Sequence, residues 1–141
     1  MNSKKSIIVN NISRSSDSRG KIISIVDSNI SNVSIITCNS GSIRSNHYHL
    51  KDFHFMYVLE GEIDYFYKDL DSEKIEYLKV KKDQNIFTPP MEIHATYFPI
   101  HTKIIVSSLN PRDQETYERD TVRVEFVNEE NIRELLNTFA V

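Results

Sequence analysis

The 141-residue sequence lacks several features that mark particular classes of protein. Cys38 is its only cysteine, so no intrachain disulfide can form, which suits a reducing compartment. No apolar run approaches the ~20 residues that a membrane-spanning helix needs. Residues 1–20 have a basic tip but lack the apolar stretch and cleavage site of a signal peptide. We therefore expect a cytoplasmic protein with no membrane partner.

An excess of basic charge is also missing. The 17 Lys and Arg residues are outnumbered by 20 Asp and Glu residues, which gives a net charge of -3. Nucleic-acid-binding proteins usually carry a basic stripe, so we expect no nucleic-acid partner. Pocket charge and net charge are independent, and an anionic small substrate is compatible with this composition.

The length and the hydrophobic content of 39% suit one globular domain with its own core. We expect a single domain over residues 1–141. It would comprise N-terminal strands and a loop (1–40), a central core (41–108), and a loop followed by a C-terminal strand and helix (109–141).

Short runs rich in Ile, Val, Tyr, Phe and Thr dominate the chain, with turn signals between them. Such a succession of short strands predicts an all-β sandwich or barrel. A tight hairpin is expected at Gly61, which can adopt the positive φ that such turns need. The predicted strands are Lys21–Val26, Val33–Cys38, Ile43–His49, Phe53–Leu59, Glu62–Tyr67, Ile75–Val80, Asn85–Phe87, Ile93–Phe98, Lys103–Ser108 and Val122–Phe126.

Three segments depart from this pattern. Asn11–Gly20 is rich in Ser, Arg and Asp and predicts an early loop, and Asn110–Asp120 predicts a polar loop with one helical turn. Near the C-terminus, Asn128 is a candidate N-cap. The apolar residues after it recur at helical spacing and predict a short helix that packs on the barrel or on a partner subunit: Ile132, Leu135, Leu136 and Phe139.

Four of the five histidines form a pattern. His47 and His49 are two residues apart on a predicted strand, so their side chains leave the same face. His54 begins the next strand, and His94 follows a rigid Pro-Pro turn. A lone histidine is usually a surface or core residue, which is our interpretation of His101. The pattern of the other four predicts one pocket, which holds a metal or acts in proton transfer.

These residues resemble the two motifs of the cupin family. Residues 41–61 keep the spacing of the first motif (Gly, five residues, His-x-His, four residues, Glu, six residues, Gly), with His54 in place of Glu. Residues 83–98 keep the spacing of the second motif around His94, although Asp83, Met91 and Phe98 replace its Gly, Gly and Asn. The resemblance implies an all-β double-stranded β-helix, the cupin jelly-roll barrel, with a short C-terminal helix here.

In cupins, the histidine pair, the Glu and the second-motif histidine bind one divalent metal. Carried over, His47, His49 and His94 would be ligands, and His54 either a fourth ligand or an outward-pointing residue. Imidazole ligands suit a divalent transition metal (Zn, Fe, Ni or Mn) better than Mg or Ca.

A narrower resemblance involves Asp17-Ser-Arg19-Gly, the run Arg44–His49 and Thr88-Pro-Pro-Met. These are similar to cupins that act on deoxysugar nucleotides: 3,5-epimerases, 3,4-ketoisomerases and capsule-biosynthesis cupins. The resemblance implies an isomerase or epimerase acting on a nucleotide-diphosphate 4-keto sugar in surface-polysaccharide biosynthesis, and a homodimer. His94 departs from the metal-free isomerases, which is why a metal is retained in the prediction.

This chemistry removes a proton beside a carbonyl group and returns it. His47 and His49 are the candidate bases. If they hold a metal, a tyrosine must move the proton, and Tyr65 and Tyr67 share one face of their strand. The remaining candidates are Tyr57 for catalysis and, for the substrate with its diphosphate, Arg19, Arg44 and Tyr67. The other arginines, Arg112, Arg119 and Arg123, are expected in a surface loop or a subunit contact.

Two other functions fit the same residues. An all-histidine site also suits a metal-dependent Fe or Cu dioxygenase, and a non-catalytic sugar-binding cupin would bind ligand without turnover. Oxygen uptake would favour the dioxygenase, whereas incorporation of solvent deuterium into a 4-keto nucleotide sugar would favour the isomerase.

Overall fold

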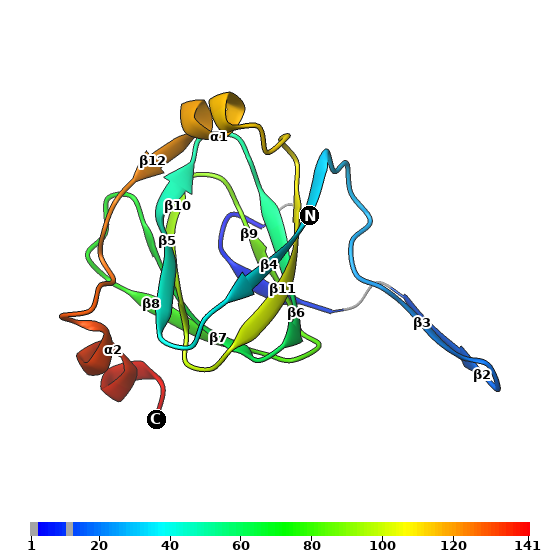
Figure 1. The fold of residues 1–141 in the computed structure, drawn as a ribbon. Coiled ribbons are helices and arrows are strands. Elements are labelled where there is room, and N and C mark those ends of the chain that lie inside the picture. Colours follow the sequence, from blue (N-terminus) through cyan, green and yellow to red (C-terminus); the bar gives the residue numbers. More distant parts are fainter. Residues whose placement is uncertain (1–2, 11–12) are drawn as a thin grey trace.

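The computed structural model describes residues 3–10 and 13–141, and most strands form two five-stranded antiparallel sheets that enclose a barrel (Figure 1). The first sheet has the order β1 (Ile7–Val9), β9 (Asn85–Thr88), β6 (His54–Glu60), β11 (Thr102–Ser108), β4 (Asn32–Cys38). The second has the order β12 (Thr121–Arg123), β5 (Ser42–His49), β10 (Glu92–Phe98), β7 (Glu62–Asp69), β8 (Glu76–Lys81). The all-β jelly-roll prediction is confirmed.

The core between the sheets is built from alternate residues of each strand, since successive side chains point to opposite faces. Tyr65 and Tyr67 both point inward, as their shared parity requires. Burial of this cluster supplies most of the free energy that closes the barrel. Its members are Cys38, Met56, Val58, Ile63, Tyr65, Tyr67, Val80, Ile86, Phe98, Ile104 and Val106.

The hairpin between β6 and β7 turns at Gly61, as predicted. Its φ is +88°, and a Cβ there would collide with Thr102 and the His101 carbonyl. Only glycine fits this turn without moving the backbone of the neighbouring strand.

The C-terminal helix α2 (Ile132–Phe139) packs on the outer face of the second sheet, over Phe66 and Ala95. This confirms the predicted helix. Of the two surfaces considered for it, the barrel and a partner subunit, the helix packs on the barrel. The helix begins after Asn131, so the prediction that Asn128 is the N-cap is wrong. The Asn128 side chain instead accepts the backbone N–H groups of Glu130 and Asn131 and closes the turn before the helix.

A separate hairpin of β2 (Ser13–Asp17) and β3 (Gly20–Ser24) projects from the barrel (Figure 1). The loop predicted for Asn11–Gly20 is therefore wrong over residues 13–17, while residues 11 and 12 lie outside the described part of the chain. A two-stranded ribbon that projects from the barrel needs few buried apolar side chains, so its sequence is as polar as that of a loop. Two predicted strands are also too long, because β3 ends at Ser24 and β12 ends at Arg123.

Helix α1 (Gln114–Asp120) lies over one end of the barrel (Figure 1). Asp113 caps it by accepting the Thr116 backbone N–H at 3.0 Å. This is the helical turn predicted within the polar segment 110–120. Among the described residues, no helix has both the length and the apolar character to cross a membrane.

Candidate active site

A β-bulge sets the position of the first histidine. His47 pairs with His94 across the β5–β10 ladder, but the next residue of β10, Ala95, pairs with Ser45, which leaves Asn46 as the extra residue. Ser45 and Asn46 both have positive φ. The Asn46 side chain holds the bulge by bonding the backbone of residues 126 and 127 at 2.8–3.1 Å. His47 therefore faces His94 inside the barrel.

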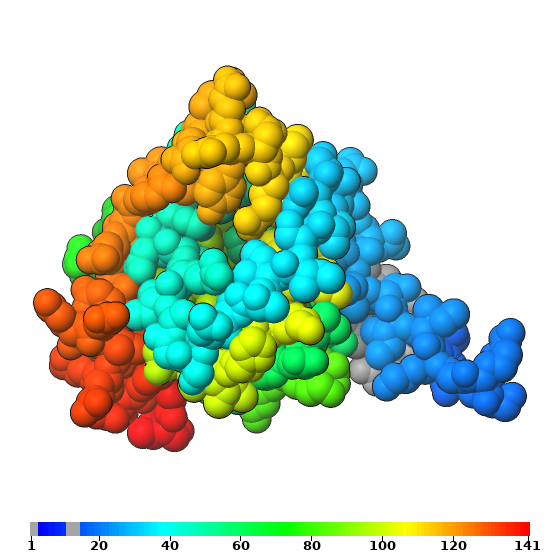
Figure 2. Space-filling model, viewed as in Figure 1, coloured from blue at the N-terminus to red at the C-terminus, as the bar shows by residue number. Residues whose placement is uncertain are grey.

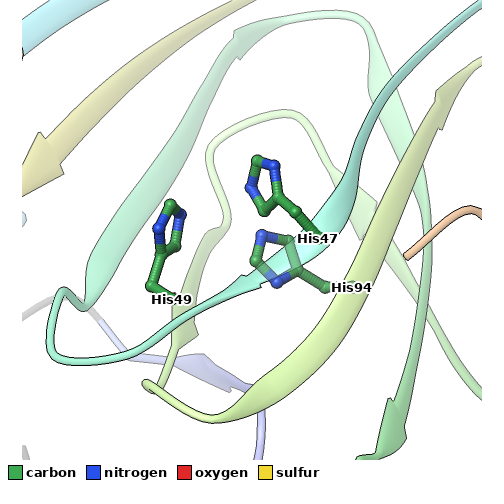
Figure 3. A group of neighbouring side chains, drawn as sticks. All are labelled: His47, His49 and His94. Carbon is green, nitrogen blue, oxygen red and sulfur yellow. The ribbon is translucent and has the colours of Figure 1, made fainter. Parts of the chain in front are cut away.

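Four imidazoles meet there, which we call the histidine cluster: His47, His49, His54 and His94. The His47 ring centroid lies 4.6 Å from that of His49 and 4.8 Å from that of His94, and Figure 3 shows these three rings gathered together. The His54 ring lies 5.2 Å from the His94 ring and 5.9 Å from the His49 ring. His54 is buried in this cluster, so the alternative that it points outward is wrong.

Burial keeps the cluster neutral. It lowers the pKa of His47 to about 2, helped by the rings of His94 and His49. Burial likewise lowers the pKa of His94 to about 3 and the pKa of His54 well below its usual range. The pKa of His49 is also lowered by burial, but the Asp120 carboxylate opposes that shift. Neutral imidazoles offer a lone pair each, as proton acceptors or as metal ligands.

The ring of His94 has a defined tautomer. Its Nδ1 lies 3.2 Å from the Glu92 carbonyl oxygen, which can only accept, so Nδ1 carries the proton. Its Nε2 is then a buried lone pair, and this nitrogen has no hydrogen-bond partner among the described residues. His47, His49 and His94 each offer one ligand nitrogen, and these three nitrogens lie within 4.8 Å of one another. An unpartnered lone pair in such a group fits a divalent transition metal.

Three members of the histidine cluster line a pocket between α1 and the strands β4 and β5, on the face shown in Figure 2, whereas the fourth, His94, is fully buried and does not line it. The Tyr117 ring of α1 lies 5.7 Å from the His49 ring and 6.3 Å from the His47 ring. The Arg112 guanidinium lies 5.4 Å from the centroid of Tyr117. Arg112 is exposed in the irregular segment before α1, as the predicted surface loop requires, and it also lines the pocket.

Two buried carboxylates also line the pocket. Asp120 ends α1, and its oxygens accept the backbone N–H groups of Lys51 and Asp52 at 2.9 and 3.0 Å. Burial raises the pKa of Asp52 to about 6. Sequence reasoning missed Tyr117, Asp52 and Asp120, and no spacing signal connects them to the histidines.

The remaining predicted residues divide into those at the pocket and those away from it. Arg44 lines the pocket and donates to the Thr37 carbonyl at 3.2 Å. Arg19 lies on the projecting hairpin, exposed and paired with Asp17 at 2.7 Å, so this chain does not bring it to its own histidines. His101 is exposed, as predicted.

None of the three predicted tyrosines lines the pocket. The Tyr57 hydroxyl donates to Asp83 at 3.2 Å. The Tyr65 ring stacks on His94 at 6.1 Å, but its hydroxyl is bonded to Ser6 and Thr88, both at 2.7 Å. Tyr67 belongs to the core. The tyrosine whose ring contacts both His47 and His49 is Tyr117.

Comparison with known families decides the classification. The profile of a family described as "Polysaccharide biosynthesis C-terminal domain" matches residues 15–109. The chain belongs to this family. No curated protein matches its sequence.

Solved structures share the fold of this family member. QdtA, a sugar 3,4-ketoisomerase from Thermoanaerobacterium thermosaccharolyticum in complex with TDP, is 20% identical with a TM-score of 0.66, over 96% of this chain and 98% of that one. The WlaRB TDP-quinovose 3,4-ketoisomerase from Campylobacter jejuni is 19% identical with a TM-score of 0.70, over 85% and 93%. The dTDP-4-dehydrorhamnose 3,5-epimerase from Sulfolobus tokodaii is 14% identical with a TM-score of 0.67, over 92% and 85%. The fold is thus that of the sugar-nucleotide-modifying cupins.

Proposed function

We propose that this chain is an enzyme that moves a proton on a nucleotide-diphosphate-linked 4-keto sugar, as an isomerase or epimerase of surface-polysaccharide biosynthesis. The observation that carries the proposal is the group of neutral imidazoles of His47, His49 and His54 on the wall of a pocket edged by arginines. The family match and the ketoisomerase and epimerase names of its structural neighbours support the same substrate class.

A hydrogen beside a carbonyl group is removed by a base that is neutral and still strong enough to hold the proton. His49 suits this role best because the Asp120 carboxylate opposes the lowering of its pKa by burial, whereas burial makes His47 a weaker base. His47 and His49 stand side by side and both reach the pocket. One ring accepts the proton and becomes an imidazolium, which returns the proton to the substrate, either directly or by way of the other ring. Inverting a centre returns the proton to the other face of the same carbon. Moving the carbonyl returns it to the former carbonyl carbon, and a hydroxyl proton also passes from one substrate oxygen to the other.

The mouth of the pocket suits a nucleoside diphosphate. Arg44 and Arg112 place two guanidinium groups there, whose forked donors match phosphate oxygens. Tyr117 adds an aromatic ring beside the histidines. These three residues would bind the nucleotide part and leave the sugar against the cluster.

The same rings fit a metal. His47, His49 and His94 would hold Zn, Fe, Ni or Mn, with His54 beside them. When bound, the metal would act as a Lewis acid that stabilises negative charge on the substrate oxygen. Metal analysis of the purified protein tests this part. Bound Fe or Cu together with oxygen uptake would instead favour a dioxygenase, the second candidate for a three-histidine site.

Isotope exchange tests the proposed function directly. We expect the protein, given a TDP-linked 4-keto sugar in D2O, to introduce deuterium at a carbon next to or at the carbonyl position, detected by NMR. An isomerase moves the carbonyl, whereas an epimerase leaves it at C4 and exchanges its neighbours.

The variants H47A and H49A should abolish this exchange, because each removes one of the paired imidazoles. H101Q is the matched control, since it removes an exposed histidine outside the cluster and should exchange like the wild type. Absence of exchange in the wild type with every 4-keto sugar nucleotide tried, or full exchange in H49A, would refute the proposal.

A further inference from the structure

The ring of His49 is held from behind by two residues at the junction of α1 and β12. Its Nδ1 lies 3.3 Å from the Thr121 hydroxyl oxygen and 3.7 Å from a carboxylate oxygen of Asp120. These two residues are consecutive in the sequence, and the proposed function gives neither of them a role in positioning the ring.

The direction of the Thr121 contact follows from its other bond. The Thr121 hydroxyl lies 2.6 Å from the Tyr117 carbonyl oxygen, which can only accept, so the hydroxyl hydrogen points there. Towards His49, the Thr121 oxygen can then only accept. The Asp120 carboxylate also only accepts. The proton of the neutral His49 ring is thereby fixed on Nδ1, and its Nε2 keeps a lone pair.

Asp120 cannot easily move away from this position. Its two carboxylate oxygens accept the N–H groups of Lys51 and Asp52, and its backbone carbonyl accepts the N–H of Leu50 at 2.9 Å. These three residues form the turn that directly follows His49. These hydrogen bonds fix the end of helix α1 to the turn after the strand that carries His49, and the Asp120 carboxylate is buried there.

We propose that Asp120 and Thr121 are positioning residues that hold His49 in the Nδ1–H tautomer and present its Nε2 lone pair to the pocket. His49 is thus the proton acceptor of the pair. That catalytic consequence rests on the proposed function, whereas the position of the proton on the ring does not. Carboxylates behind metal-binding imidazoles fix the tautomer and orientation of the ring in this way, and their loss typically reduces metal affinity or activity by about 10- to 100-fold.

The tautomer of His49 is measured by long-range 1H–15N NMR on 15N-labelled protein at neutral pH, with the signals assigned by comparison with H49Q. A metal on Nε2 would leave the same proton on Nδ1, so the protein is first dialysed against EDTA. We expect the Nδ1–H form in the wild type. In D120N, the amide can donate to Nδ1, which should shift the ring to the Nε2–H form. T121V, a smaller change, should give a mixture of the two.

In turnover of a 4-keto sugar nucleotide, D120N should lose about 10- to 100-fold in kcat with KM unchanged. D113N is the matched control, because it makes the same chemical change at the exposed cap of the same helix. A wild type with the proton on Nε2, or unchanged tautomer populations in both D120N and T121V, would overturn the positioning role. A wild type with the Nδ1–H form but no turnover would refute the proposed function and leave the positioning intact.

Discussion

At the scale of single residues, buried histidines link the stability of the barrel to acidity. The pKa of His94 falls from 6.5 to about 3 on folding because the ring is buried, so the folded protein resists its protonation. The unfolded chain binds that proton below about pH 6.5. With respect to His94, the free energy of unfolding therefore has its full value above pH 6.5 and decreases as the pH falls towards 3. Glu92 acts in the opposite direction, since burial raises its pKa to about 7.

Because the effects of His94 and Glu92 oppose each other, the pH dependence of the wild type alone does not isolate His94. Comparison of the wild type with a His94 variant does. Between pH 7 and pH 5, His94 should cost the wild type about 2 kcal/mol in the free energy of unfolding. H94Q, which cannot take up that proton, should lose about 2 kcal/mol less than the wild type over this range. Urea unfolding of EDTA-dialysed protein at both pH values measures the difference. H101Q should behave like the wild type, and an equal loss in H94Q would contradict the pKa shift.

At the scale of elements, the strands and the helical turn of α1 were predictable, but the position of α1 over the pocket was not. β-Branched and aromatic residues mark most strands, and the spacing from Gly41 to Gly61 places His47, His49 and His54 on one site. Strand patterns contain no information on which segment covers the end of a barrel. Tyr117 and Asp120 therefore lay unrecognised in a polar stretch typical of a surface loop. Only the folded chain brings this stretch to residues about half the sequence away.

Helix α1 and the segment before it should determine affinity for the nucleotide. R112A removes a guanidinium at the mouth of the pocket, and loss of a charge-assisted contact to phosphate costs about 1.5–3 kcal/mol. We expect KM for the sugar nucleotide and Kd for TDP to rise by about 10- to 100-fold, with kcat nearly unchanged. Steady-state kinetics and calorimetry measure these values.

The matched control is R119A, which removes an exposed arginine of α1 that does not line the pocket. Its KM should equal that of the wild type. If R112A fell in kcat at constant KM, Arg112 would act on the reacting sugar and not on the diphosphate.

At the scale of the whole molecule, the two faces of the barrel differ in how their apolar surface is covered. Helix α2 covers the outer face of the second sheet. On the first sheet, the edge strand β4 leaves Val33 and Ile35 with 62% and 68% of their surfaces exposed. Ile22 on the projecting hairpin is 69% exposed. An edge strand with apolar side chains readily pairs with another chain.

We propose that a second copy of the chain covers this face, as a homodimer in which the β4 surface of each copy contacts the other. In such a two-fold arrangement the same patch meets itself, so one substitution weakens the interface twice. The double variant V33K/I35K should therefore shift the protein from twice the chain mass of 16.5 kDa to the chain mass in sedimentation equilibrium, while remaining folded by circular dichroism. I100K places the same charge at another exposed apolar residue and should stay dimeric. A monomeric wild type, or a dimeric V33K/I35K, would show that this surface does not hold two copies together.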